Sequence, residues 1–429
     1  MESRGVRAQD RTNREDYLAQ KIGRRALLGT MAFGAARPAR AATPEIRIGV
    51  LTEFSGPNAS STGVGSVIAT KLAADDFKLT EPTLQVEILE GDHQAQPDIA
   101  LAIARRWLDQ GVDVITNLNN SAAALAVSAL VRERNRVALL TAPASSDFTG
   151  RACGPNHVHW TYDTWALGNG TGRALVEAGG KTWFFIGADY TFGHLLADDT
   201  GRIVREAGGS VLGAVFTPYP GTTDFSAFLL QAQASGAQVV ALANSGTNTT
   251  NCIKQAHEFG LTRGGTRLAA LLMTIIDVDA LGLEVAEGLV LTAPFYWDFN
   301  DGTRTFSRRF AQRQNGRMLT MLQAGDYSAT THYLKTVQSL GPARAKANGR
   351  LVVETMKALP VTDPLFGPAR IRADGRLLTP MHVFQVKSPA ESHYPWDYYR
   401  LLRTIPAEAA FRPMMAGLCP MVTGPLGPK

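Results

Sequence analysis

Short β-rich segments and helical segments alternate along the chain from residue 45 onward. A first series runs from EIRIGVLT (45–52) to VALLT (137–141), and a second begins at WFFIGA (183–188) after a loop of small residues. Such alternation is typical of a parallel sheet that helices cover on both faces. Two series of comparable length predict an α/β protein with two similar lobes.

The excess of positive charge lies entirely in the first 41 residues. This segment holds nine Lys or Arg and four Asp or Glu, a difference equal to the +5 of the whole chain. Residues 42–429 therefore carry equal numbers of basic and acidic side chains. A neutral body is not typical of a nucleic-acid-binding protein, so we expect no nucleic-acid partner.

The same 41 residues have the pattern of an export signal. Arg24 and Arg25 precede a weakly apolar run of about ten residues, and Ala39-Arg40-Ala41 supplies a small-x-small cleavage site. The run is about half as long as a bilayer span, which indicates a cleaved segment instead of an anchor. We expect a twin-arginine signal peptide over residues 1–41. A disordered basic N-terminus with a chance Arg-Arg pair is the alternative.

Three cysteines permit one disulfide bond and leave one free thiol in an oxidising compartment. Cys153 lies in a Gly/Pro loop and Cys419 in a Pro-rich C-terminal segment, so both are expected at the surface. Cys252 begins an apparent helix over 252–259 and is expected to be buried. We therefore predict a bond between Cys153 and Cys419 that ties the C-terminal segment to the body.

No set of residues in the sequence predicts catalysis. The GxG segments at 63–65 and 170–172 lack the third glycine of a dinucleotide loop. His157-Val158-His159 places two imidazoles on one strand face but has no third ligand nearby, and Ser245 does not lie in a G-x-S-x-G motif. We expect no enzyme activity, no cofactor and no metal site.

Small polar residues follow three predicted strands of the first series, over 52–57, 117–121 and 141–147. In open α/β sheets, ligands bind at the carboxyl ends of the strands, where the next helices present free N–H groups. Taken singly, Ser121 fits a helix N-cap and the serines after residue 144 fit a turn. Taken together at neighbouring strand ends, these residues favour a binding site.

Seven segments of the chain occur in an order found in one protein family. They are IRIGVLTEFSGP (46–57), GDHQAQPDIALAIARRWLDQGVDVI (91–115), ASSDFTG (144–150), HWTYDT (159–164), ADYTFG (188–193), GTTDFSAFLLQAQ (221–233) and IKQAHEFGL (253–261). In these segments the chain resembles the type I periplasmic solute-binding proteins of the branched-chain amino-acid ABC transporter family, and it is close to their aromatic-acid-binding members.

The resemblance implies two Rossmann-like lobes joined by three hinge strands. Lobe 1 is expected from residues 44–162 and 295–382, and lobe 2 from residues 163–294 and 383–405. The sequence indicates a last strand over 380–386, and the residues after this strand have a Pro-rich composition. Residues 406–429 are expected to form a C-terminal tail that the Cys153–Cys419 bond ties to the body.

The resemblance also implies a ligand site in the cleft between the lobes, with an acid near residue 277 that holds an ammonium group in the amino-acid binders. Aromatic residues near the predicted hinges and cleft, Tyr296 included, suit a planar ligand, although Trp160 and Trp297 fit a hinge core equally well. The expected ligand-binding residues are Ser55, Asn120, Ser121, Ala144, Ser145, Ser146, Trp160, Tyr162, Phe192, Ser245, Gly246, Asp277 and Trp297.

The function implied is that of a periplasmic substrate-binding component of an ABC importer, a monomer that works with a membrane permease and ATPase. The favoured ligand is a small organic acid, either an aromatic carboxylate or an aromatic 2-oxo acid. Branched-chain amino acids, short amides or urea are the alternatives, as is a ligand-sensing receptor subunit. Asn58, where the family commonly has tyrosine, and the Asn-Asn-Ser turn at 119–121 disfavour ordinary leucine-type specificity.

Overall fold

The computed structural model describes residues 45–424, which belong to one compact unit. The expected twin-arginine signal with its cleavage site lies outside these residues. Within them, every helix falls short of the length and hydrophobicity that a membrane span requires.

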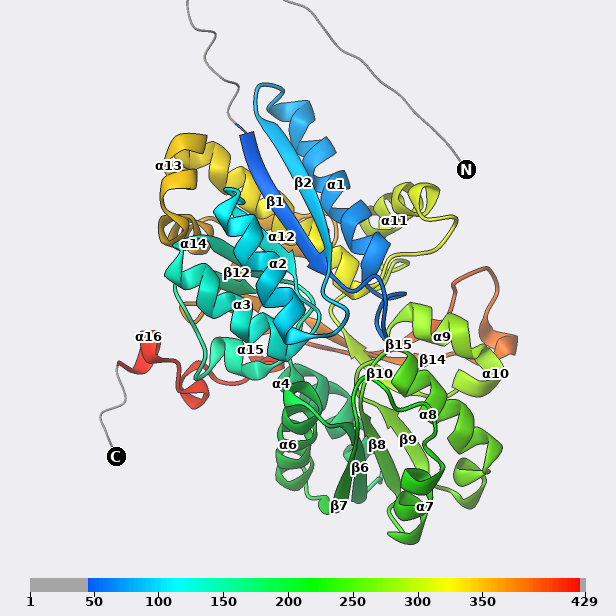
Figure 1. The fold of residues 1–429 in the computed structure, drawn as a ribbon. Helices are drawn as coiled ribbons and strands as arrows, with labels where there is room; N and C mark the ends of the chain where they lie inside the picture. The colour runs from blue at the N-terminus through cyan, green and yellow to red at the C-terminus, as the bar shows by residue number, and fades with distance from the viewer. Residues whose placement is uncertain (1–44, 425–429) are drawn as a thin grey trace, which may run out of the picture. The chain divides into compact units, whose positions relative to one another are not determined.

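Five parallel strands form the first sheet, in the order β2-β1-β3-β4-β5. They are β1 (Glu45–Thr52), β2 (Gln85–Asp92), β3 (Val114–Asn117), β4 (Val137–Leu140) and β5 (His157–His159). Helices α2 (Pro97–Asp109) and α3 (Ser121–Glu133) cover one face, and α1 (Gly63–Thr80) and α12 (Met321–Leu340) the other (Figure 1). Along β3, Val114 packs on the α12 side and Ile115 on the α2 side, as the two-residue period of a strand requires.

Four parallel strands form the second sheet, in the order β7-β6-β8-β9. They are β6 (Thr182–Ala188), β7 (Ser210–Thr217), β8 (Val239–Ala243) and β9 (Arg267–Ala270). Its helices are α4 (Thr164–Leu167), α5 (Arg173–Glu177), α6 (Thr191–Glu206), α7 (Ser226–Ala234), α8 (Thr247–Glu258), α9 (Ile275–Leu281) and α10 (Leu283–Ala286). We call the two sheets with their helices the first and second lobes. The expected two-lobed α/β fold class is confirmed.

A third, antiparallel sheet has the order β10-β14-β15 and consists of β10 (Val290–Ala293), β14 (Met381–Val386) and β15 (Tyr399–Ile405). Between β10 and β14 the chain forms α11 (Asp301–Arg313), α12, α13 (Pro342–Ala347), α14 (Gly349–Ala358), β11 (Val361–Asp363), β12 (Gly367–Ile371) and β13 (Leu377–Leu378). Strand β15 was not predicted, since the sequence indicated a last strand over 380–386. This edge strand exposes most of its residues, Leu401 and Leu402 included, so it lacks the alternation that marks a half-buried strand.

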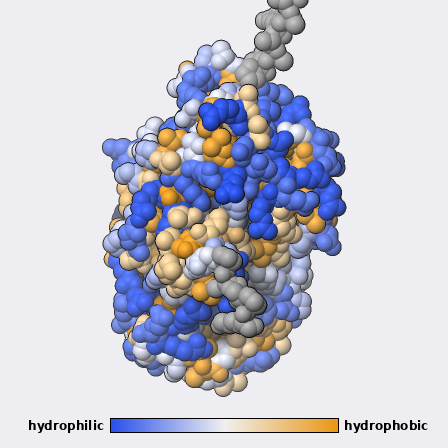
Figure 2. All heavy atoms as spheres, turned by 90° about the vertical axis from the view of Figure 1, so that its left-hand side faces the viewer, coloured by the Kyte–Doolittle hydropathy of each residue, from blue (hydrophilic) through white to orange (hydrophobic). Residues whose placement is uncertain are grey.

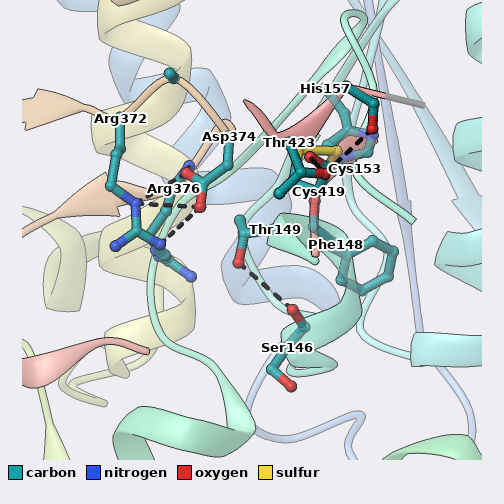
Figure 3. The surroundings of a disulfide bond; sticks show 12 residues. Ser146, Phe148, Thr149, Cys153, His157, Arg372, Asp374, Arg376, Cys419 and Thr423 are labelled. Carbon is teal, nitrogen blue, oxygen red and sulfur yellow. Dashed lines mark hydrogen bonds and ion pairs between the residues drawn. A yellow bond between two sulfur atoms is a disulfide. The ribbon is translucent and has the colours of Figure 1, made fainter. Parts of the chain in front are cut away.

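Residues 406–424, here called the C-terminal strap, contain α15 (Ala407–Ala410) and α16 (Pro420–Thr423) and pack against the body. The strap is joined to Cys153 by a disulfide from Cys419, with Cα atoms 5.6 Å apart (Figure 3). Arg412 Nη2 donates to the Ser146 carbonyl at 2.8 Å, and Asn169 Nδ2 donates to the Ala409 carbonyl at 2.8 Å. The C-terminal segment is thus tied to the body by the bond between Cys153 and Cys419 that the sequence predicts.

The expected surface position of the two bonded cysteines, however, is wrong. Cys153 is 5% exposed and Cys419 is not exposed at all, because the strap folds over the loop that carries Cys153. Cys252 is buried as expected, although its helix α8 begins five residues earlier, at Thr247. The face on the left of Figure 1, where α16 lies, is mostly hydrophilic with an apolar area near its centre (Figure 2).

Candidate ligand-binding site

One pocket has walls from both lobes. Its first-lobe residues follow the carboxyl ends of strands of the first sheet, and its second-lobe residues follow strands of the second. Together with Leu322 at the start of α12, the lining residues are Asn58, Ser61, Asn119, Ala142, Ala144, Tyr162, Tyr190, Phe192, Ser245, Gly246, Leu272, Thr274 and Asp277. The pocket thus lies where open α/β sheets bind their ligands.

Glu53 organises the first-lobe wall from behind. Its side chain is fully buried, with Oε1 accepting from the Asn58 backbone N–H and Oε2 from Asn119 Nδ2, each at 2.8 Å. Burial raises the pKa of the Glu53 carboxyl, and these hydrogen bonds oppose the rise. Glu53 therefore holds both asparagines at the pocket, and the sequence analysis did not identify it.

His93 fixes the other side of the Asn119 amide. Its Nδ1 accepts the Ala95 backbone N–H at 3.1 Å, so the ring proton of the neutral imidazole lies on Nε2. Nε2 then donates to Asn119 Oδ1 at 2.8 Å. Burial lowers the pKa of His93, which favours this neutral form. With both ends of its amide engaged, Asn119 has one orientation in the pocket wall.

Asp277 is the lining residue that carries a formal charge. Its Oδ2 accepts from the Thr274 backbone N–H at 2.7 Å and from Thr274 Oγ1 at 2.8 Å, in a capping box that begins α9. Within residues 45–424, Oδ1 receives no hydrogen bond. Burial raises the pKa of Asp277, and the Thr274 hydrogen bonds oppose the rise. A buried carboxylate with one oxygen unengaged is suited to a ligand group that donates hydrogen bonds.

Three aromatic rings provide the apolar part of the pocket. The Tyr162 hydroxyl donates to the Ala142 carbonyl at 2.8 Å, which leaves the faces of its ring for packing. Tyr190 and Phe192 lie with ring centroids 5.8 Å apart, and Tyr190 stacks on Tyr219 at 4.3 Å. Offset aromatic rings of this kind favour an apolar or planar ligand group.

The two lobes touch beside the pocket. The Thr247 N–H donates to the Pro57 carbonyl at 2.9 Å, and Asn58 Nδ2 donates to the Tyr219 hydroxyl at 3.2 Å. Gly246 has φ of +58°, and a Cβ there would lie 2.1 Å from the Pro57 carbonyl oxygen. This approach of the lobes therefore requires glycine at position 246.

Six of the expected residues line the pocket: Ala144, Tyr162, Phe192, Ser245, Gly246 and Asp277. Ser121 lies directly behind it, where its Oγ accepts from the backbone N–H groups of Ala144 and Ser145, each at 3.3 Å. Asn120, not Ser121, is the N-cap of α3, because its side chain accepts from the Ala123 N–H at 3.0 Å. Helix α3 therefore begins at Ser121, one residue earlier than that expectation assumed.

The other expected residues lie outside this pocket. Ser55 is exposed and donates to Asp92 at 2.6 Å, and the Ser145 side chain accepts from the Asp147 N–H. Ser146 donates to Asp199 at 2.8 Å. Trp160 is fully buried and its Nε1 donates to Ser328 at 3.0 Å, so it belongs to the core on the α12 side.

Trp297 lines a second pocket next to the first, as does Tyr296. Among residues the sequence analysis did not select, Thr274 had a signal, since Thr274-Ile275-Ile276-Asp277 has capping-box spacing. Asn58 and the turn at 119–121 were noted in the sequence for their effect on specificity, but the position of both asparagines depends on Glu53 and His93, which the fold brings to them. No group of three or more His, Cys, Asp or Glu residues within the described range is arranged to hold a metal ion.

Two lobes, each a parallel α/β sheet, and a pocket between them define the class of two-lobed binding proteins. A family model described as a periplasmic binding protein matches residues 45–391, and the chain belongs to this family. Proteins of this family are substrate-binding components of transporters. Small-molecule capture for a membrane permease and ATPase is thus the general role of this chain.

Solved structures agree with this assignment. A periplasmic binding protein from Burkholderia mallei is 41% identical, with a TM-score of 0.85 over 89% of this chain and 100% of that one. A branched-chain amino-acid ABC transporter periplasmic ligand-binding protein from Burkholderia xenovorans is 35% identical, with a TM-score of 0.77 over 88% and 99%. A solute-binding protein from R. palustris in complex with 4-hydroxybenzoate is 20% identical, with a TM-score of 0.76 over 85% and 97%, and shows the fold alone. A comparison with curated proteins found no match.

Proposed function

We propose that this protein captures a small amino-acid-like molecule in the pocket between its lobes and delivers it, unchanged, to an ABC importer. We also propose that the protein is exported to the periplasm by the twin-arginine route and acts as a monomer with the lobe boundaries expected from the sequence. Membership of the family and a pocket with walls from both lobes support the binding role. The relative from Burkholderia xenovorans supports an amino-acid ligand.

The observation that carries the ligand class is the Asp277 carboxylate. Thr274 engages one of its oxygens and leaves the other for the ligand. Among residues 45–424, no Lys, Arg or His lines this pocket, so Asp277 has no cation beside it among these lining residues. A buried carboxylate is strongly stabilised by an opposite charge at contact distance, which an α-ammonium group supplies.

The aromatic carboxylate that the sequence favoured is the second candidate. The rings of Tyr162, Tyr190 and Phe192 favour a planar ligand. Because burial raises the pKa of Asp277, a protonated Asp277 is able to donate a hydrogen bond to a ligand carboxylate. Binding of such an acid would then weaken as the pH rises, whereas binding of an ammonium group would not.

The test is a thermal-melt screen of protein stripped of ligand by unfolding and refolding. The panel holds leucine, valine, phenylalanine, benzoate, 4-hydroxybenzoate, phenylpyruvate, acetamide and urea. A ligand at a hundred times its Kd stabilises the fold by about 2.7 kcal/mol, which raises the Tm measurably. We expect amino acids to give the shift and to be recovered unchanged.

The matched variants are Asp277→Asn and Asp279→Asn, on the same helix. Asp279 is exposed and does not line the pocket, so its variant should bind as the native protein does. Asp277→Asn should weaken amino-acid binding by tenfold or more. If only the benzoates raise the Tm, and Asp277→Asn binds them as tightly as the native protein does, the ligand is an aromatic carboxylate and not an amino acid. A consumed ligand would contradict the binding role, and unimpaired uptake in a deletion strain would favour a receptor subunit.

A further inference from the structure

A second pocket lies next to the ligand pocket. The two share Thr274 as a lining residue. Leu272 and Leu322 line the first pocket. Their neighbours in the chain, Met273 and Met321, line the second. The two pockets are therefore adjacent, with Thr274 in the wall of both.

The walls of the second pocket are aromatic and apolar, and no lining residue carries a charge. Two of its polar groups already have partners, since the Tyr296 hydroxyl and Trp297 Nε1 both donate to the Trp396 carbonyl, at 3.0 and 2.9 Å. The Thr274 hydroxyl donates to Asp277 at 2.8 Å. These groups complete the wall and leave nothing for a ligand to bond.

Tyr399 is the exception. It lines the second pocket and is 6% exposed, and its hydroxyl oxygen is buried without a hydrogen-bond partner among residues 45–424. Its ring packs against Tyr296 and Phe384, with centroids 5.0 and 5.4 Å away, so it is held in place. Most buried hydroxyls in proteins are bonded, because an unbonded one keeps its full desolvation cost.

We propose that the pocket around Tyr399 is a specificity subsite for the far end of the ligand whose ammonium group lies at Asp277. The subsite takes an aromatic side chain that carries a polar tip, and the Tyr399 hydroxyl bonds that tip. The ligand class is therefore a hydroxyaryl amino acid. This inference rests on the proposed function, since it places the amino group of the same molecule at Asp277.

The first experiment needs no ligand. In stripped protein, Tyr399→Phe removes an unbonded hydroxyl, so its Tm should equal or exceed the native value by about 1–2 °C. Tyr296→Phe is the matched control, from the same pocket, and should lower the Tm because its hydroxyl is bonded. A fall for Tyr399→Phe as large as that of the control would show that the hydroxyl already has a partner, and would overturn the proposal.

The second experiment compares L-tyrosine with L-phenylalanine by calorimetric titration. The native protein should bind L-tyrosine about tenfold more tightly, since one extra buried hydrogen bond is worth about that factor. Tyr399→Phe should abolish the preference, and Tyr398→Phe, a change at a residue that lines neither pocket, should retain it. Equal binding of the two amino acids by the native protein, or a preference that survives in Tyr399→Phe, would overturn the subsite.

Failure of the proposed function would look different. If the native protein binds neither amino acid, Asp277 does not bind an ammonium group of the ligand. Phenol and toluene then test the subsite independently of Asp277. Phenol should stabilise the native protein more than toluene does, and this excess should vanish in Tyr399→Phe. No excess in the native protein would overturn the subsite as well.

Discussion

The guanidinium of Arg376 lies 3.8 Å from the carboxylate of Asp163, and both side chains are buried. Arg376 also donates to the backbone carbonyl of Tyr162 at 2.9 Å and to that of Trp160. These residues form the segment by which the chain leaves β5 for α4, and thus passes from the first lobe to the second. Arg376 therefore fixes the path of the first crossing between the lobes.

Replacing Arg376 by Met should destabilise the fold strongly. The change leaves Asp163 buried without its cation and removes donors from the two carbonyls, so we expect a loss of about 3–5 kcal/mol in urea unfolding. Arg370→Met is the control, since its bridge to Glu408 is exposed and should be worth about 1 kcal/mol or less. Equal losses from the two variants would contradict the role of Arg376.

Asp326 should make stability fall as the pH rises. This carboxyl on α12 is buried and accepts from Thr141 and, at 2.9 Å, from Asn117, and burial raises its pKa to about 7. In the unfolded chain it ionises near pH 4. Between these values the folded state holds the extra proton, so stability contributed by protonated Asp326 is lost as the pH rises toward 7, on the order of 4 kcal/mol if it acts alone.

The measurement is the free energy of unfolding of native protein and Asp326→Asn at several pH values from 4 to 8. The asparagine does not ionise, so the difference between the two proteins should shift in favour of the variant as the pH rises. A difference that stays constant over this range would show that Asp326 keeps an ordinary pKa.

Loss of the disulfide should destabilise the protein and release the strap. Replacing both Cys153 and Cys419 by Ser should lower the free energy of unfolding by about 2–4 kcal/mol, because the bond closes a very long loop. Ligand binding should survive, since no strap residue lines the pocket. Reductant should destabilise the native protein and leave the double variant unchanged, and cleavage by protease should begin in the strap.

Gly246→Ala should weaken ligand binding more than it weakens the fold. The added Cβ would meet the Pro57 carbonyl and hold the lobes apart beside the pocket. Gly236→Ala is the control, because Gly236 has a similar φ of +67° but no atom within 4 Å of the added carbon. Both variants carry backbone strain of about 1–3 kcal/mol, but only Gly246→Ala should lower affinity by tenfold or more. If the two variants bind the ligand with equal affinity, binding does not depend on the close approach of Gly246 to Pro57.

Strands buried on both faces were predictable from the sequence because they are short apolar runs, as in VALLT and WFFIGA, and the structure confirms both. Helix α12 begins at Met321. Its first two turns contain Gly325 and Asp326, which look unfavourable until Thr161, Thr141 and Asn117 are brought against them. The sequence of the α12 segment alone does not indicate these partners, because they lie far from it in the chain.

For the same reason, some residues of the pocket could be predicted from the sequence and others could not. Phe192, Ser245 and Gly246 come shortly after the ends of β6 and β8, and the sequence indicates both strands. Asn58 and Asn119 are held by the buried Glu53 and by His93, and this network forms only once the first sheet is assembled. Trp160 fits a planar ligand by composition, but the packing of α12 against the first sheet buries it in the core.

The capping box at Thr274 has a consequence for how such a protein diversifies. Asp277 both completes the capping box of α9 and lines the pocket. A substitution there therefore alters the charge that the pocket presents to a ligand and also removes a helix-capping interaction worth about 1 kcal/mol. Phe192 has no polar side-chain atom and so no hydrogen bond to lose. During descent from a common ancestor, ligand preference should therefore drift first at the aromatic walls and last at Asp277.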